Sequence, residues 1–316
     1  MTYAEAIRAA ITQAMKADRA VFIYGQGIND PGAYFGSTAG LELLFSSDRC
    51  FDTPLSEEAL IGMGVGAALL GQRPIYTALR IDFLMLAMNQ IVNHAAKWPA
   101  ASGHQCSVPL TIRCIVGRDW GQSAQHSGAY HSMFASVPGL QVALPSNPSD
   151  AAGLLLAAIQ SDLPTVFVES KSLYGMQGDV EQPIQPIPLG KARVAREGLD
   201  ITLIAISDSV DLAMQAAEIL QPYAISAEVL DLRTIAPLDE AAIKRSVAKT
   251  GRVAVFDIGW QRFGLASEIA RVLQMPLVSF GQKWEHTPGG CFREYEHYPR
   301  PNRVVDELLR SFTNGR

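Results

Sequence analysis

Short apolar runs alternate with helical patterns along almost the whole chain, and this alternation limits the possible fold more than any other feature. Each run ends at turn residues, as the segment 20–24 does at Gly25, which is typical of strands buried on both faces. In the first half, strands are predicted at 20–24, 74–77, 110–115, 140–144 and 165–168, and helices at 6–15, 57–70, 83–98 and 148–160. Such alternation predicts a parallel sheet covered by helices on both faces.

A stretch rich in glycine and proline interrupts the alternation over 175–190 and is the best linker candidate. Beyond it the pattern resumes, with strands predicted at 201–206, 227–232, 253–256 and 276–280 and helices at 209–220, 239–248, 264–273 and 302–312. We therefore expect an α/β architecture in two domains, with a parallel-sheet domain over 1–185 and a smaller α/β domain over 190–316.

Composition narrows the class of protein. The 316 residues carry a formal net charge of -5 with the signs mixed, so no surface for nucleic acid is expected. No apolar run approaches the roughly 20 residues of a membrane helix, and the first residues lack a basic end followed by an apolar stretch, so no membrane partner and no secretory signal are expected. The four cysteines form no CxxC pair, which favours free thiols in a reducing cytoplasm.

Several familiar motifs are missing from the sequence. No GxGxxG follows a strand, and GxxxxGK[ST], HExxH and GxSxG do not occur. The nearest glycine fragment, 62–66, lies inside an alanine-rich helical pattern, where close helix packing is its expected role. The missing glycine fingerprint disfavours a simple nicotinamide dehydrogenase.

Three short segments carry side chains that could do chemistry, and each also has an ordinary structural explanation. Glu57 follows Ser56 at a helix start, where Ser56 would cap the helix and Glu57 would favour its positive end. His126 lies on a small polar loop, where it could meet a ligand or be a surface histidine. Phe83 follows Asp82 at another helix start and could be a core aromatic. The residue types alone leave these alternatives open.

Taken together and in order, these segments resemble the beta subunit of the thiamine-diphosphate-dependent decarboxylating component of 2-oxoacid dehydrogenase complexes, of pyruvate, branched-chain oxoacid or acetoin type. The matching segments are FDTPLSE at 51–57, AALLGQRP at 67–74, QIVNHAAK at 90–97, AQHS at 124–127 and DLRTIAPLD at 231–239. The resemblance covers about 1–280. It implies a transketolase-like pyrimidine-binding domain followed by a transketolase C-terminal-type domain.

The resemblance also implies roles for particular residues. Glu57 matches the glutamate that hydrogen-bonds the N1′ nitrogen of thiamine diphosphate, so it counts as both catalytic and cofactor-binding. Phe83 matches the aromatic residue that packs on the pyrimidine ring, and His126 matches the histidine associated with proton handling and acyl transfer. A structural potassium ion is implied as well. Its backbone carbonyl ligands would belong to Leu110, Ala158, Ser161 and Leu163.

The family's diphosphate and magnesium motif, GDG with a later asparagine, is missing from the sequence. The resemblance therefore implies an alpha-type partner that carries the magnesium site. It further implies an alpha2-beta2 heterotetramer, in which the C-terminal domain pairs the beta chains and docks a lipoyl acyltransferase component.

The chain departs from the family pattern at Gln26, where members usually carry a glutamate, in the loop 117–131, and over 284–291. The neutral Gln26 puts in doubt a proton path proposed to link the two active sites of the family. His131 and His286, within the changed segments, are expected to be ordinary residues. Because these changes lie where substrate and acceptor would be met, two alternatives to oxidative decarboxylation stay open: a split thiamine-diphosphate-dependent carboligase or transketolase-like subunit, and a non-catalytic scaffold.

Overall fold

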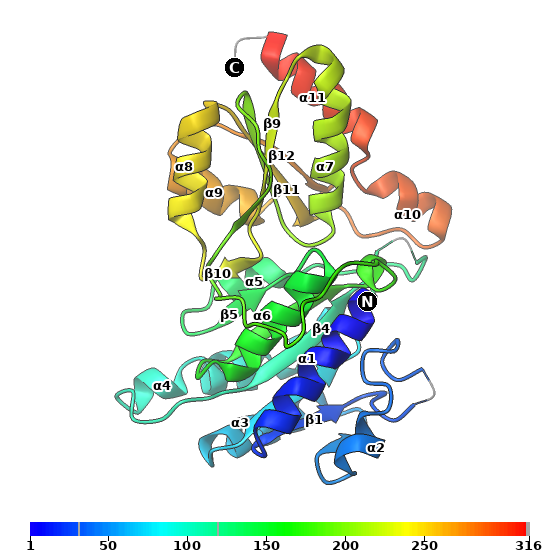
Figure 1. Ribbon diagram of the computed structural model, residues 1–316, viewed down its shortest axis with the longest axis vertical. Helices are drawn as coiled ribbons and strands as arrows, with labels where there is room; N and C mark the ends of the chain where they lie inside the picture. Colours follow the sequence, from blue (N-terminus) through cyan, green and yellow to red (C-terminus); the bar gives the residue numbers. More distant parts are fainter. Residues whose placement is uncertain (31, 119, 314–316) are drawn as a thin grey trace.

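The computed structural model describes residues 1–313 except residues 31 and 119. Two α/β units lie one above the other, each with a central sheet between helices (Figure 1). Apart from the helix expected over 83–98, the strands and helices expected from the sequence are present in both units, with small shifts at their ends. The two-domain α/β fold is therefore confirmed.

The first unit is built on a sheet of seven strands in the order β10-β5-β6-β4-β3-β1-β2, parallel except for β10. Neighbouring residues of its strands are buried on opposite faces, as Ile23 and Tyr24 show. This explains why the strands read as continuous apolar runs. The strands are β1 (Val21–Gly25), β2 (Cys50–Asp52), β3 (Arg73–Ala78), β4 (Thr111–Val116), β5 (Gln141–Ala143), β6 (Thr165–Ser170) and β10 (Thr234–Ala236).

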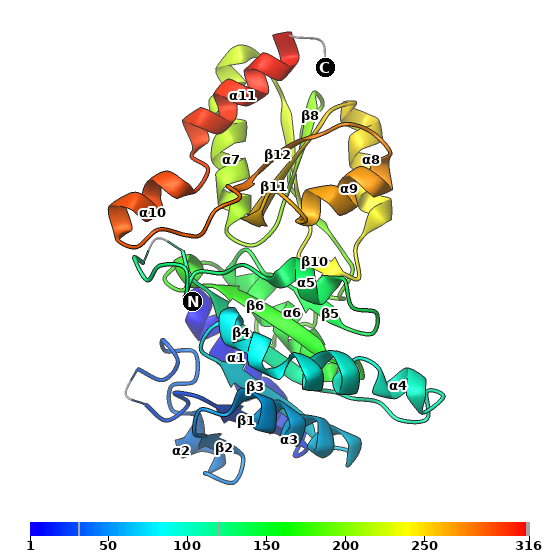
Figure 2. The same ribbon diagram turned by 180° about the vertical axis from the view of Figure 1, so that it is seen from behind.

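Helices α1 (Tyr3–Ala17) and α6 (Pro148–Gln160) pack together on one face of this sheet, and α3 (Glu57–Leu69) packs on the other (Figures 1 and 2). The helix predicted over 83–98 is not one regular α-helix. A 3-10 helix, η1 (Ile81–Ala87), leads into a π-helix, η2 (Asn89–Ala95). Irregular helical turns of this kind are frequent at functional sites. The short helices α2 (Leu41–Phe45), α4 (Trp98–Ala101), α5 (His131–Ala135) and η3 (Lys171–Leu173) complete the unit.

The second unit has a five-stranded sheet in the order β12-β11-β8-β9-β7, with only β7 antiparallel. Its strands are β7 (Arg193–Arg196), β8 (Ile201–Ala205), β9 (Ala227–Asp231), β11 (Val253–Trp260) and β12 (Val278–Gln282). Helices α7 (Ser209–Leu220) and α11 (Pro301–Thr313) cover one face and α8 (Glu240–Thr250) and α9 (Leu265–Leu273) the other (Figure 2). The segments η4 (Gln221–Tyr223) and α10 (Cys291–His297) connect these elements.

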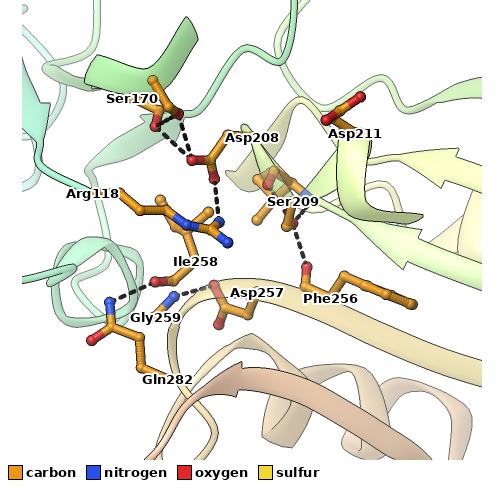
Figure 3. Close-up of polar contacts among 12 residues, drawn as sticks. Arg118, Ser170, Asp208, Ser209, Asp211, Phe256, Asp257, Ile258, Gly259 and Gln282 are labelled. Atoms are coloured by element: carbon orange, nitrogen blue, oxygen red, sulfur yellow. Dashed lines mark hydrogen bonds and ion pairs between the residues drawn. The ribbon is translucent and has the colours of Figure 1, made fainter. Parts of the chain in front are cut away.

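Strand β10 and several ion pairs join the units, among them those of Asp150 with Arg193 and Arg233. No pattern in the sequence predicted that β10 would leave the second unit and pair with β5 of the first. Arg118 donates from Nη1 to Asp208 Oδ1 at 3.2 Å, and Ser170 Oγ donates to the same carboxylate (Figure 3). The fully buried His131 holds Asp257 through Nε2 at 2.8 Å from Oδ1. His131 is therefore a contact between the units.

Within the described part of the chain, no helix has both the length and the apolar character needed to cross a membrane. All four cysteines are free thiols, of which Cys50 and Cys114 are buried. No disulfide therefore contributes to the fold, as the sequence predicted.

Candidate active site

Glu57 is the first residue of α3 and is only 7% exposed. The side-chain amide of Gln26 donates from Nε2 to Glu57 Oε1 over 3.1 Å. The N-cap position is taken by Ser56, but its side chain makes no capping hydrogen bond, so the capping expected from the sequence is not realised. The buried carboxyl group is thus held by Gln26, the residue at which the sequence departs from the family pattern that it resembles.

A tight strand end brings Gln26 to Glu57. Gly25, the last residue of β1, has a φ of +139°, and a Cβ there would lie 2.3 Å from the Thr77 carbonyl oxygen. Only glycine fits this close approach of β1 to β3. The amide of Gln26 then donates to that carbonyl at 3.2 Å, and Thr53 donates its amide to the Gly25 carbonyl at 3.0 Å.

Buried polar atoms without hydrogen-bond partners gather at the same strand end. They are Gln26 Oε1, Thr53 Oγ1 and Tyr76 OH, while Thr77 Oγ1 also lacks a partner but belongs to the opposite face of the sheet from Tyr76. Burial, and then the Glu57 carboxylate, raise the pKa of the Tyr76 hydroxyl. Because buried polar groups are nearly always paired in folded proteins, such a cluster is typical of a site that binds a polar ligand. Its position at the carboxyl ends of parallel strands is where α/β proteins bind ligands.

Phe83 and His126 come together beside this region. Phe83 is half-buried in η1, which packs against α3, and its ring lies edge-on to His126, with centroids 5.7 Å apart. Two of the residues singled out in the sequence, 43 positions apart, are therefore neighbours in space. The core-aromatic explanation for Phe83 is not supported, because the ring is only partly buried.

Asp82 joins the site without having been predicted as a site residue. Its Oδ1 accepts the Gly128 amide at 3.1 Å, while its Oδ2 is buried with no partner. Burial raises the pKa of Asp82, although the Gly128 amide and the nearby His126 oppose this. Perturbed carboxyls of this kind cluster at functional sites. The only sequence signal was its place immediately before Phe83.

The carbonyls expected to bind potassium already accept hydrogen bonds within the chain. Leu110 accepts the Thr165 amide at 2.9 Å, and Arg73 donates from Nη1 to the Ser161 carbonyl at 3.0 Å. The carbonyls of Ala158 and Leu163 also have donors. Each of these carbonyl oxygens keeps a second lone pair beside its donor, so potassium binding at the four residues stays a prediction. Among the described residues, no group of three or more His, Cys, Asp or Glu could hold a metal.

His286 lies away from Glu57, in the wall of an aromatic cavity of about 500 Å³ between the two units. Tyr130 and Trp260 form its inner wall, with ring centroids 5.3 Å apart, and Trp284 lies beyond them. Neither His131 nor His286 contributes to the group around Glu57.

Family models match both units in the same order. The transketolase pyrimidine-binding domain matches residues 1–177, and the transketolase C-terminal domain matches residues 190–309. The beta subunit of 2-oxoisovalerate dehydrogenase from Bacillus subtilis is 40% identical over 86% of this chain and 84% of its own length. The chain belongs to the transketolase-like family of 2-oxoacid dehydrogenase beta subunits. Two further relatives match most of the chain. The beta subunit of acetoin:2,6-dichlorophenolindophenol oxidoreductase from Bacillus subtilis is 36% identical over 98% of this chain and 96% of its own length. The pyruvate dehydrogenase E1 beta subunit from Rickettsia bellii is 40% identical over 89% of this chain and 86% of its own length.

Solved structures support the same fold for this member of the beta-subunit family. A split-gene transketolase, described as an inactive beta4 tetramer, superposes with a TM-score of 0.80 at 20% identity, covering 99% of this chain and 98% of that one. Transketolase from Campylobacter jejuni superposes with a TM-score of 0.75 at 14% identity. The match covers 98% of this chain but 46% of the transketolase. At these identities the likeness establishes the fold alone.

Proposed function

We propose that this chain is the beta subunit of a thiamine-diphosphate-dependent 2-oxoacid dehydrogenase, which decarboxylates a 2-oxoacid and passes the acyl group to a lipoyl carrier. The observation that carries the proposal is the buried carboxyl of Glu57, held by Gln26 among unpartnered polar atoms at the carboxyl edge of the sheet. A flat heteroaromatic ring with a polar edge fits this arrangement. The aminopyrimidine of thiamine diphosphate has that shape and that polarity.

Each of the predicted residues has a distinct part in this proposal. Glu57 would hydrogen-bond the N1′ edge of the aminopyrimidine, and the ring of Phe83 would pack on its face. His126, which lies on a loop with its ring edge-on to Phe83, would move a proton to or from the substrate at its imidazole. When bound, the coenzyme supplies the nucleophilic carbon that adds to the oxo group of the substrate. The buried environment of Asp82 would help to keep water from these groups.

The surface around Glu57 supports docking of an alpha-type partner. Leu55, Met63 and Leu86 are exposed on the elements that carry Glu57 and Phe83. On α3, the exposed Gly66 would let another chain approach closely, because a Cβ there would meet nothing within 4 Å. Exposed apolar surface of this kind is typical of protein–protein contacts.

The partner would supply the diphosphate and magnesium end of the site, because the GDG motif with its later asparagine is missing from this sequence. We include in the proposal an alpha2-beta2 assembly that pairs beta chains through the C-terminal domain, a lipoyl acyltransferase as the next component, and domain bounds of 1–185 and 190–316. A potassium ion held by the backbone carbonyls of Leu110, Ala158, Ser161 and Leu163 is also part of the proposal, since each oxygen keeps a lone pair beside its donor.

The test is reconstitution with an alpha-type subunit, thiamine diphosphate and magnesium. Glu57→Gln should lower kcat by about 10²–10⁴-fold, the usual contribution of a positioned acid or base. The matched control is Glu58→Gln, because Glu58 also lies in the first turn of α3 but is exposed. That variant should keep its activity. Equal activities of the two variants would reject the role of Glu57.

A split carboligase or transketolase-like subunit is the second candidate. The changed loop favours it, because Trp120 of that loop packs on Arg80, within the segment that leads to Phe83. Product analysis without lipoamide separates the candidates, since formation of a new carbon–carbon bond would replace acyl transfer. An assembled alpha–beta pair that gives no heat with thiamine diphosphate in calorimetry would point instead to a scaffold.

A further inference from the structure

Two cations meet at the carboxyl edge of the first sheet. Arg80 follows β3, Lys171 follows β6, and both lie on the ring of Phe35. The distances to the ring centroid are 5.8 Å for Arg80 Cζ and 4.7 Å for Lys171 Nζ. Within the described part of the chain, neither has a carboxylate within ion-pair distance. Two like charges in a partly desolvated place repel each other unless an anion joins them.

The side chain of Arg80 is 8% exposed and incompletely paired. Its guanidinium lies 4.0 Å from the ring centroid of Trp120, and its Nη2 donates to Gln122 Oε1 over a long 3.3 Å. Nη1 donates to the Leu79 carbonyl, but Nε is buried without any partner. Burial of a charge is unfavourable unless it is paired, so aromatic rings alone are a weak substitute for an anion.

A neighbouring cation shows how this chain neutralises a buried charge. Arg113 is fully buried, and Glu169 binds its Nε at 2.6 Å and its Nη2 at 2.9 Å. Among the residues that the structure describes, no carboxylate binds Arg80 in this way. Asp82 is near enough to influence it, but forms no ion pair with it and accepts the Gly128 amide instead.

Arg80 is connected to the candidate active site through its own segment and through the Trp120 ring. Arg80 precedes Asp82 and Phe83 on the same segment. The Trp120 ring that covers Arg80 donates from Nε1 to Ser127 Oγ at 3.2 Å, and Ser127 follows His126. An anion between Arg80 and Lys171 would therefore lie close to the groups that handle the substrate.

We propose that Arg80 and Lys171 bind an anionic group, a carboxylate or a phosphate, that the substrate carries in addition to its 2-oxoacid group. This deepens the proposed function and rests on it, because the anion is part of a substrate only if the chain acts on 2-oxoacids. The planar guanidinium would hold two oxygens of the anion, and the ammonium would add a point charge. Phe35 and Trp120 would form the walls. Dicarboxylic or phosphorylated 2-oxoacids are thus the substrate class that fits, in place of purely apolar ones.

Binding of simple anions tests the subsite without any turnover. Inorganic phosphate and malonate would be titrated calorimetrically into the assembled alpha–beta complex at an ionic strength fixed with chloride. Arg80→Gln and Lys171→Gln should each weaken binding by about tenfold or more, as expected for loss of a charged contact. Lys244→Gln is the control, because it removes the same charge from an exposed residue paired with Glu240. Equal affinities in all variants, or no binding to the wild-type complex, would overturn the subsite.

Steady-state kinetics then show whether the anion belongs to the substrate. In the wild-type complex, KM should be lower for 2-oxoglutarate than for 2-oxobutyrate. Lys171→Gln should raise only the KM for 2-oxoglutarate, and Arg80→Lys should restore part of what Arg80→Gln loses. Equal changes of KM with both substrates would mean that Arg80 only holds the loop with Trp120 and Gln122 in place, and would overturn the proposal. If no 2-oxoacid reacts while phosphate still binds at Arg80, the proposed function fails and the anion subsite stands.

Discussion

The pair formed by His131 and Asp257 should contribute strongly to the stability of the two-domain arrangement. Both side chains are buried, and the contact joins α5 of the first unit to β11 of the second. Replacing His131 by Leu would leave a buried carboxylate without its cationic or donor partner. Removal of one member of a buried pair costs about 3–5 kcal/mol. Asp257 would keep the amides of Gly259 and Leu265, each at 3.0 Å, which places the cost near the lower end.

We therefore expect His131→Leu to lower the free energy of unfolding by about 3 kcal/mol, or Tm by about 6–12 °C. Asp257→Asn keeps an acceptor for His131 and should cost less, about 1–2 kcal/mol. Urea and thermal denaturation followed by circular dichroism would give both values, and the double variant completes a cycle. The control is Arg303→Leu, which removes an exposed ion pair with Glu296 and should cost less than about 1 kcal/mol. Additive effects of the two buried substitutions would refute the reasoning.

Acid should weaken the same contact. Burial would raise the pKa of Asp257, but the charge and hydrogen bond of His131 and the two amides together hold that pKa below its usual value. A carboxyl with a lowered pKa stabilises the fold above its unfolded pKa, and that contribution is lost as the pH falls through the lowered pKa. The loss of stability on acidification below about pH 4 should therefore be smaller in Asp257→Asn than in the wild type. Identical acid profiles would contradict this.

Three further substitutions test the site and the helix beside it. Gln26→Met removes the donor to Glu57 and should lower kcat/KM by about tenfold or more, since a hydrogen bond to a charged group contributes about 1.5–3 kcal/mol. An unchanged kcat/KM would show that Gln26 does not position Glu57. Phe83→Ala should weaken binding of thiamine diphosphate by about 1–2 kcal/mol in calorimetry of the assembled complex, because a ring contact is lost. Gly64→Ala should destabilise the chain by about 1–3 kcal/mol, because the added Cβ would lie 2.3 Å from the Tyr24 hydroxyl. The control is Gly66→Ala, whose added Cβ would meet no atom within 4 Å. In denaturation of the beta chain that variant should be as stable as the wild type or more stable.

The sequence predicted those elements whose signal is local. Strands buried on both faces, such as β4, produce unbroken apolar runs, and amphipathic helices such as α7 show a clear period. The strand β10 carries no such signal, because its three residues owe their conformation to pairing with β5, far away in the chain. The division of 83–98 into 3-10 and π turns was likewise invisible, since the residues there are ordinary helix formers.

The sequence predicted which residues belong to the candidate site, but not which of them are in contact. Glu57, Phe83 and His126 stood out by their segments, yet only the fold shows that Phe83 meets His126. Asp82 was missed because its significance comes from burial, which depends on Gly128 in a different loop. His131 was expected to be ordinary because its partner, Asp257, lies 126 residues further along the chain. Long-range contacts of this kind leave no pattern in neighbouring residues.

The exchange of an acid for an amide at Gln26 changes how the central carboxyl group is held. A second carboxylate at the 3.1 Å now spanned by the hydrogen bond would repel Glu57 by about 5 kcal/mol at an effective dielectric constant near 20. Such a pair would have to share a proton to remain buried. The neutral amide instead donates to Glu57 and adds no charge, so this site needs no shared proton between positions 26 and 57.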